Sequence, residues 1–142
     1  MIAYLDSSVL LRILLAQPGG LDEWEEVEIG VTSKLTRVEC SRTLNRLLLA
    51  NMLDQDDFAQ RQAMFVDIWA RLVILPLDDA ILNAAAGPLP TKISSLDAIQ
   101  LVSALSYRDA QPGDEPSIHM ATHDQELAVA ARAVGFAVIG TP

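Results

Sequence analysis

The chain contains one cysteine, two histidines and no long uninterrupted hydrophobic run. Cys40 has no partner for an internal disulfide, and one cysteine with two histidines is too few for a structural zinc site. Asp6 interrupts the apolar segment from Met1 to Leu15, so the sequence predicts neither a signal peptide nor a membrane span. We therefore expect a cytoplasmic protein with no membrane partner, in which any metal is bound by oxygen.

Basic residues are also few: 10 Lys and Arg stand against 19 Asp and Glu, a net charge of -9. Such a chain repels nucleic acid on average, so binding RNA would require local Arg and Lys side chains and bound cations. The 51% hydrophobic content of the 142 residues excludes disorder and is enough for a folded core. The sequence has no internal repeat, low-complexity tract or linker, so we expect one domain over residues 1–142.

Short apolar runs alternate with segments of helical spacing along the chain. Strands are expected over residues 2–5, 28–32, 73–75, 118–122 and 136–139. Helices are expected over residues 9–15, 34–52, 55–71, 78–86 and 124–134 and after Ser94 or Ser95, with a polar turn at 112–116. This alternation predicts a three-layer αβα fold with a central parallel sheet of four to five short strands, whose ligand site lies beyond the carboxyl ends of the strands.

Four acidic residues occupy positions that such a sheet would bring together. Asp6 follows the first predicted strand, Asp124 follows the strand at 118–122, Asp97 is near a helix start and Glu39 is on a long helix. Carboxylates in close quarters stay ionised only when a cation neutralises them. The placement therefore predicts a Mg²⁺ or Mn²⁺ site, with Asp6 and Asp97 as the primary ligands.

Each acid also has a local explanation. Asp6 and Asp124 can cap the helices that follow them, and Asp97 stands three residues after Ser94, which is the spacing of a capping box. Glu39 can form an exposed ion pair with Arg42, three residues along the same helix. Placement of all four acids at one predicted edge of the sheet favours the metal site.

Four segments follow one another in a recognisable order: Tyr4-Leu5-Asp6-Ser7-Ser8, Thr36-Arg37-Val38-Glu39-Cys40, Ser95-Leu96-Asp97-Ala98-Ile99-Gln100-Leu101 and Ala121-Thr122-His123-Asp124. Together, and over essentially the whole chain, they resemble the PIN domain, and most of all the VapC-type toxins of prokaryotic type II toxin-antitoxin systems. One departure is Gln100, where many relatives carry a histidine.

The resemblance implies a Mg²⁺- or Mn²⁺-dependent endoribonuclease with metal held by Asp6, Glu39, Asp97 and Asp124. It also implies that Ser7 and Thr122 orient these acids or their waters. Independently of the resemblance, divalent cations suit phosphodiester hydrolysis, because they acidify a nucleophilic water and stabilise the extra charge on the phosphate. Two-metal sites hold the ions about 3.5 to 4 Å apart. None of the four acids is expected to act as a covalent nucleophile.

Arg42 and Arg46 lie on the helical face of Glu39 and are candidates for holding substrate phosphate, although an ordinary polar helix face is the alternative. Trp24 and Trp69 are not grouped with basic residues, which favours core or partner contacts over base stacking. Likewise His119 and His123 have no matching ligands, so neither is predicted to bind metal.

The helices at residues 34–71 carry more apolar residues than one packing face accounts for, among them Leu47, Leu48, Met64, Phe65 and Trp69. We therefore predict a homodimer and a cognate antitoxin partner, with a large core as the alternative. A haloacid-dehalogenase-like phosphatase is disfavoured by Ser8, where a second acid is needed, and a receiver domain by the lack of a late lysine. The remaining alternatives are a catalytically silent PIN-like module that binds a partner or RNA, and an RNA-processing nuclease without an antitoxin.

Overall fold

Five short parallel strands form one sheet in a computed structural model, which describes residues 1–113 and 117–141. The strands run in the order β3-β2-β1-β4-β5, so β1 is central and β3 and β5 are the edges. Their bounds are β1 (Ile2–Leu5), β2 (Ile29–Ser33), β3 (Val73–Leu75), β4 (Ile118–Ala121) and β5 (Ala137–Ile139). The predicted parallel sheet of short strands is confirmed.

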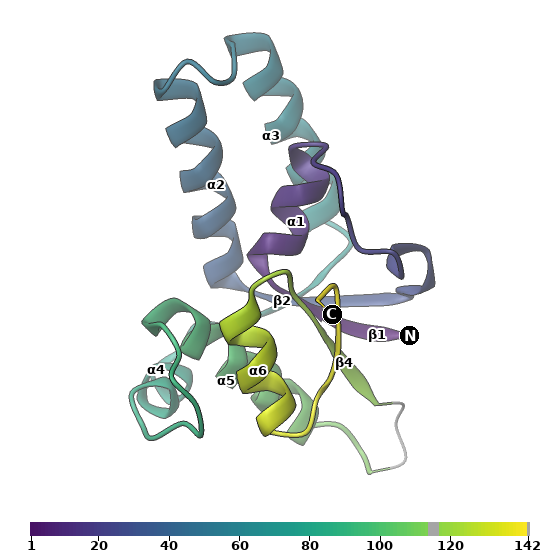
Figure 1. The fold of residues 1–142 in the computed structure, drawn as a ribbon, viewed down its shortest axis with the longest axis vertical. Helices are drawn as coiled ribbons and strands as arrows, with labels where there is room; N and C mark the ends of the chain where they lie inside the picture. Colours follow the sequence, from purple (N-terminus) through teal and green to yellow (C-terminus); the bar gives the residue numbers. More distant parts are fainter. Residues whose placement is uncertain (114–116, 142) are drawn as a thin grey trace.

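Helices cover both faces of this sheet (Figure 1). They are α1 (Ser7–Leu14), α2 (Lys34–Leu49), α3 (Gln55–Trp69), α4 (Asp79–Ala85), α5 (Ser95–Asp109) and α6 (Gln125–Ala133), with a short 3₁₀ turn at Trp24–Glu26. α1, α2 and α3 lie on one face, and α2 and α3 project from it as an antiparallel hairpin. α5 and α6 lie on the other face, where α4 packs on α5. The predicted three-layer αβα architecture is therefore confirmed.

The side chains of β1 point alternately to the two faces of the sheet and so belong to two parts of the core. Ile2 and Tyr4 belong to a buried cluster with residues of α5 and α6, whereas Ala3 and Leu5 pack with residues of α1, α2 and α3. A parallel strand covered by helices on both faces is apolar at every position, as this one is. Burial of a leucine such as Leu5, which is fully enclosed, stabilises the fold by about 1.5–3 kcal/mol.

The order of the strands changes direction between β1 and β4. From β1 the chain proceeds through β2 to β3 on one side, whereas β4 is followed by β5 on the other side. β1 leads into α1 on one face of the sheet and β4 leads into α6 on the opposite face, so the two connections diverge and leave a crevice at the carboxyl ends. Asp6 follows β1 and its backbone N–H donates to the Ala121 carbonyl at 3.0 Å. The chain thus places Asp6 and the Thr122–Asp124 segment side by side at this crevice.

Several helix ends differ from the sequence prediction. α2 ends at Leu49 rather than Met52, because Asn51 adopts a left-handed conformation with φ of 56°. There the N–H of Asn51 donates to the Leu48 carbonyl and that of Met52 to the Leu47 carbonyl, the pattern of a Schellman motif. α3 likewise ends at Trp69 rather than at residue 71. The turn predicted at 112–116 lies partly outside the described residues.

The predicted helix starts agree with the structure better than the predicted helix ends do. Ser94, one of the two serines named as possible starts, caps α5, while Asp54 caps α3 and Ser33 caps α2. No helix in the described part of the chain is both long enough and apolar enough to cross a membrane.

Candidate functional site

Asp6 is almost completely buried, with 3% of its surface exposed, and one of its oxygens is held by several donors. Oδ2 accepts hydrogen bonds from Ser8 Oγ at 2.6 Å, from Thr122 Oγ1 at 3.0 Å and from the Ser8 backbone N–H at 3.3 Å. Oδ1 has only a long contact of 3.4 Å with Ser7 Oγ. Asp6 therefore caps α1, which is the local explanation given for it in the sequence. The cap uses Oδ2 and leaves Oδ1 with only one long contact.

Glu39 reaches the same region from α2. Ser7 Oγ donates to its Oε2 at 2.7 Å and Gln100 Nε2 donates to its Oε1 at 2.7 Å. Because Ser7 contacts both Glu39 and Asp6, it links the two carboxylates. Within the described residues, Glu39 forms no ion pair with Arg42, so the alternative of an exposed surface pair is wrong.

Asp97 and Asp124 stand at helix starts, as the local explanation requires. Ser94 Oγ donates to Asp97 Oδ2 at 2.6 Å and accepts from the Asp97 N–H at 3.2 Å, so Ser94 caps α5 and also orients the Asp97 carboxylate. Asp124 Oδ1 accepts from the Leu127 N–H at 2.8 Å and caps α6. Of the residues described, none hydrogen-bonds to Asp97 Oδ1 or Asp124 Oδ2. Each cap fixes the direction of a carboxylate and leaves one oxygen for another ligand.

Thr122 joins two of the acids. Its hydroxyl donates to Asp6 Oδ2 at 3.0 Å and accepts from the Asp124 N–H at 3.0 Å, and its side chain is fully buried. Ser8, which sequence reasoning did not select, lies in the same network and accepts from the His123 N–H at 2.9 Å. The signal for Ser8 was its place two residues after an N-cap aspartate, where a hydroxyl can reach the carboxylate.

The charges of these acids act on one another. Burial raises the pKa of Glu39, and the negative charges of Asp6 and Asp97 raise it further, while the bonds from Ser7 and Gln100 lower it. Burial likewise raises the pKa of Asp97, with added contributions from Asp124, Asp6 and Glu126, against a lowering bond from Ser94. Glu126, which was not selected from the sequence, is exposed in the first turn of α6. Mutual repulsion of this kind is what a divalent cation relieves.

The structure does not arrange the four acids as a closed cage. Across residues 1–113 and 117–141, no group of three or more His, Cys, Asp and Glu side chains has the geometry of a metal centre. Ser7 and Thr122 connect Asp6 with Glu39 and Asp124, whereas Asp97 acts on the others through its charge. Mg²⁺ keeps several waters and commonly uses only one or two protein carboxylates, so this set of oxygen donors fits Mg²⁺ or Mn²⁺.

Comparison with known proteins agrees with this fold and this order of residues. The model of the PIN domain family matches residues 3–133. The chain belongs to the PIN domain family. Two curated Mycobacterium tuberculosis proteins are similar to it over nearly their whole length. Ribonuclease VapC46 (strain ATCC 25618 / H37Rv) is 30% identical over 142 residues, covering 96% of this chain and 95% of the relative. Ribonuclease VapC47 (strain CDC 1551 / Oshkosh) is 29% identical over 140 residues, covering 94% and 92%.

Solved structures share the fold of this PIN domain. FitAcB from Neisseria gonorrhoeae superposes with a TM-score of 0.64 at 20% identity, covering 96% of each chain. PAE2754 from Pyrobaculum aerophilum superposes with a TM-score of 0.62 at 18% identity, covering 97% of this chain and 90% of that one. The αβα arrangement is thus shared with proteins of quite different sequence.

A groove of about 570 Å³ in this PIN domain reaches Asp124. Ser8, His123 and Asp124 line its end at the sheet, and Arg12 and Arg46 line its walls on α1 and α2. Arg12 was missed by sequence reasoning, and its guanidinium donates to the Gly19 carbonyl at 2.6 Å. His123 Nδ1 lies 2.7 Å from the Gly140 carbonyl. The groove brings cationic side chains next to a site that is otherwise acidic.

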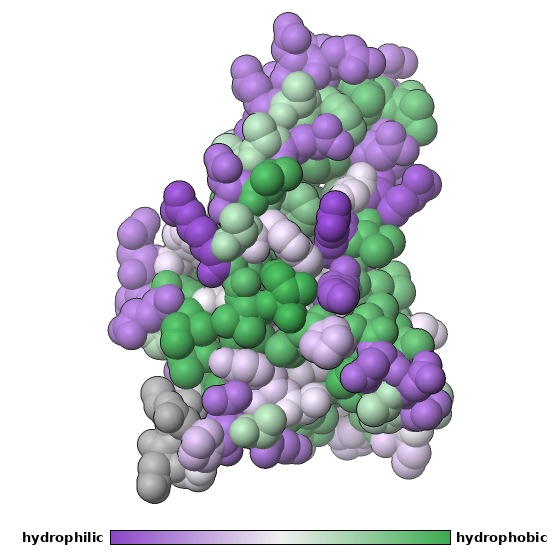
Figure 2. Space-filling view, turned by 180° about the vertical axis from the view of Figure 1, so that it is seen from behind, coloured by the Kyte–Doolittle hydropathy of each residue, from purple (hydrophilic) through white to green (hydrophobic). Residues whose placement is uncertain are grey.

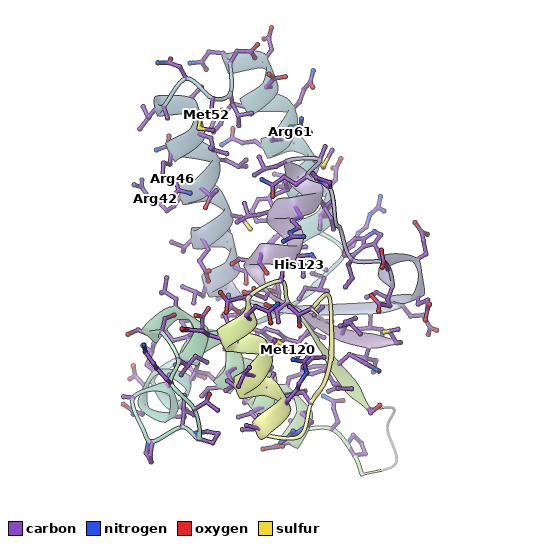
Figure 3. All side chains as sticks on the ribbon, viewed as in Figure 1. Arg42, Arg46, Met52, Arg61, Met120 and His123 are labelled. Carbon is purple, nitrogen blue, oxygen red and sulfur yellow. The ribbon has the colours of Figure 1, made fainter. Side chains whose placement is uncertain are left out.

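Arg46 also borders a second groove on α2, together with Arg42. Both arginines point outward from α2, away from α3, whereas His123 lies near the base of α1 and α6 (Figure 3). Arg42 and Arg46 thus lie on the same side of α2, and of the two only Arg46 also lines the groove that reaches Asp124.

Proposed function

We propose that this PIN domain is a metal-dependent endoribonuclease and the toxin component of a toxin-antitoxin pair. The observation that carries the proposal is the setting of Asp6, a buried carboxylate at the crevice of the sheet with one oxygen fixed by Ser8 and Thr122. Three further acids lie within reach of its charge or share its hydrogen-bond partners. Similarity to proteins named ribonucleases supports RNA as the substrate, and an RNA substrate is consistent with action in the cytoplasm.

In this proposal Asp6 and Asp97 are the primary ligands of Mg²⁺ or Mn²⁺, and Asp124 and Glu39 complete the site directly or through water. When bound, the cation supplies an activated water and offsets the negative charge on the phosphate. Ser7 holds Glu39 toward Asp6, and Thr122 holds Asp6 and the backbone of Asp124. These bonds fix the carboxylates before substrate arrives, which favours a preorganised site.

Metal removal tests the activity directly. We expect the purified protein to cleave a mixed cellular RNA pool with Mg²⁺ or Mn²⁺, to lose cleavage in a chelator and to regain it with excess metal, because the carboxylates alone repel phosphate. The measurement is the size distribution of the RNA after incubation under the three conditions. Equal cleavage with chelator would contradict metal dependence. Metal binding without cleavage of any RNA would favour a module that only binds.

We further propose that Arg42 and Arg46 hold the phosphates of the RNA, with Arg12 across the groove. The chain is acidic overall, so Arg12 and Arg46 are a local exception, because they line a groove that reaches Ser8 and Asp124 beside the proposed metal site. Phosphate contacts contribute most of the salt-dependent affinity for nucleic acid. This surface would allow an acidic protein to bind RNA.

Arg46→Ala is expected to reduce the slope of log affinity against log salt by about 0.7, the value for one phosphate contact on a single strand. RNA affinity is measured by fluorescence anisotropy at several salt concentrations, with Asp6→Asn in every protein so that the RNA is not cut. Arg71→Ala serves as the control, because Arg71 is exposed between α3 and β3 and lines neither of these grooves. An unchanged slope for Arg46→Ala would assign Arg46 to an ordinary solvated face.

We propose that the α2–α3 hairpin contacts the antitoxin and a second copy of the chain. Among the five apolar residues singled out in the sequence, Phe65 is buried, Leu47, Leu48 and Trp69 are half-buried and Met64 is 39% exposed. The large apolar residues that are most exposed on this hairpin are instead Leu49, Met52, Val66 and Val38. Figure 2 shows hydrophobic residues at the surface of the projecting part of the molecule, among hydrophilic ones.

An apolar groove of about 640 Å³ between α2 and α3 suits a segment of the antitoxin. Its lining includes Leu44, Phe65, Val66 and Trp69, with Arg37 among its polar residues. Light scattering at high protein concentration tests the dimer, for which we expect twice the mass of the chain. A mass equal to one chain would contradict the dimer and leave the antitoxin as the occupant of this surface.

A further inference from the structure

Gln100 is fully buried in the middle of α5, and each polar atom of its carboxamide has a partner. Oε1 accepts from the Tyr4 hydroxyl at 2.6 Å. Nε2 donates to Glu39 Oε1 at 2.7 Å and to Thr36 Oγ1 at 3.0 Å. An amide nitrogen has two N–H donors, and both are used here. A buried glutamine with complete hydrogen bonding holds its neighbours in one arrangement.

The orientation of this amide is determined by its surroundings. The Glu39 carboxylate can only accept hydrogen bonds, so the nitrogen of Gln100 has to face it and the oxygen has to face Tyr4. A flipped amide would set Oε1 against Glu39 Oε1, two acceptors without a proton between them. The position of Glu39 therefore depends on an amide that is itself fixed by β1.

The same network continues to the end of β1. The Thr36 and Thr32 hydroxyl oxygens lie 2.8 Å apart, and Thr32 Oγ1 lies 2.7 Å from the Leu5 carbonyl oxygen. Leu5 directly precedes Asp6, and Tyr4 lies on the same strand. Hydrogen bonds thus connect α5, α2 and the carboxyl ends of β1 and β2 behind the acids. All the side chains of this network except Glu39 are buried.

We propose that Gln100 is a positioning residue that holds the Glu39 carboxylate in the orientation needed to bind a divalent cation. The proposal rests on the function proposed above, and it concerns a residue that does not itself touch the metal. Ser7 fixes Oε2 of Glu39 and Gln100 fixes Oε1, so the carboxylate is held from two sides by α1 and α5. Partners of this kind commonly determine metal affinity by about 10–100-fold.

The test compares Mn²⁺ affinity, measured by isothermal titration calorimetry, in variants whose folding is followed by thermal melting. Gln100→Met has a similar length and no donor, and we expect it to lower Mn²⁺ affinity by about 10–100-fold. Gln100→His retains an N–H that can donate to Glu39, and we expect it to bind Mn²⁺ more tightly than Gln100→Met. Leu101→Met is the matched control, because Leu101 is the next buried residue of α5. The Leu101→Met variant should bind Mn²⁺ as tightly as the natural chain.

Tyr4→Phe provides a second test, because it removes only the hydroxyl that holds Oε1. We expect an affinity between those of the natural chain and Gln100→Met. If Gln100→Met folds and binds Mn²⁺ like the natural chain, the inference is overturned. If Gln100→Met does not fold, an unchanged affinity in Tyr4→Phe overturns it.

Asp6→Asn separates failure of this inference from failure of the proposed function. Loss of Mn²⁺ binding in Asp6→Asn together with unchanged binding in Gln100→Met would overturn only the role of Gln100. If the natural chain binds no Mn²⁺, the metal site and the role of Gln100 both fail.

Discussion

Asp6→Asn is expected to reduce RNA cleavage by more than about 100-fold, since loss of residues that merely support a metal ligand already costs 10–100-fold. The fold should survive, because asparagine caps a helix about as well as aspartate and its side-chain oxygen can still accept from Ser8 and Thr122. The measurement is the initial rate of RNA cleavage, with circular dichroism and thermal melting to verify folding. Full activity in the folded variant would remove Asp6 from the metal site.

Asp54→Asn is the matched control for this substitution. Asp54 caps α3 in the same way, with Oδ1 accepting from the Asp57 N–H at 2.7 Å. It stands at the outer end of the α2–α3 hairpin, far from the crevice of the sheet (Figure 1). Cleavage by Asp54→Asn should equal that of the natural chain, because only the charge at the crevice acts on the metal. A similar loss in both variants would indicate a general effect of removing a cap.

Thr122→Val is expected to reduce cleavage by about 10–100-fold, the usual cost of losing a residue that orients a metal ligand. Valine has nearly the same shape as threonine but lacks the hydroxyl that donates to Asp6 Oδ2 and accepts from the Asp124 N–H. Two of the four acids therefore lose support in one substitution. The cleavage rate and the Mn²⁺ affinity are measured together, and both should fall.

Thr122→Ser separates the hydroxyl from the buried methyl group of Thr122. Serine keeps both hydrogen bonds and loses a methyl group, at a cost to folding stability of about 0.8 kcal/mol. We expect Thr122→Ser to retain most of the activity that Thr122→Val loses. Equal activity in the two variants would show that Thr122 contributes packing rather than orientation of Asp6 and Asp124.

Much of the fold was predictable because its determinants are local. The apolar run Ile2–Leu5 followed by Asp6 specifies a strand and a helix start within a few residues, and both are found there. Ser33, Ser94 and Asp124 cap their helices through bonds that reach only two or three residues along the chain. The end of α2 was less predictable, because Asn51 closes it through a left-handed backbone that no glycine marks.

The candidate site was predictable only in part. Acids at the ends of β1 and β4 follow from parallel topology, so Asp6 and Asp124 could be expected near each other. The resemblance implied that Ser7 orients the acids, but the bond from Gln100 to Glu39, which are 61 residues apart in sequence, could not be expected. From the sequence alone, an ion pair between Glu39 and Arg42 was as reasonable as a role for Glu39 in a metal site. Arg12 lines the groove with Arg46 because α1 packs beside α2, a contact that the sequence does not show.

The αβα class and most helix caps were predictable from the sequence, because periodicity and capping act over short distances. The order of motifs also led to the proposal of the four acids as metal ligands. The tertiary structure was needed to show which oxygens of those acids are engaged, that Gln100 donates to Glu39, and that Arg46 lines a groove reaching Asp124. The physical reason is that hydrogen bonds and charge interactions depend on distances of a few ångströms in space. Those distances exist only after the sheet has brought β1, β4, α2 and α5 together.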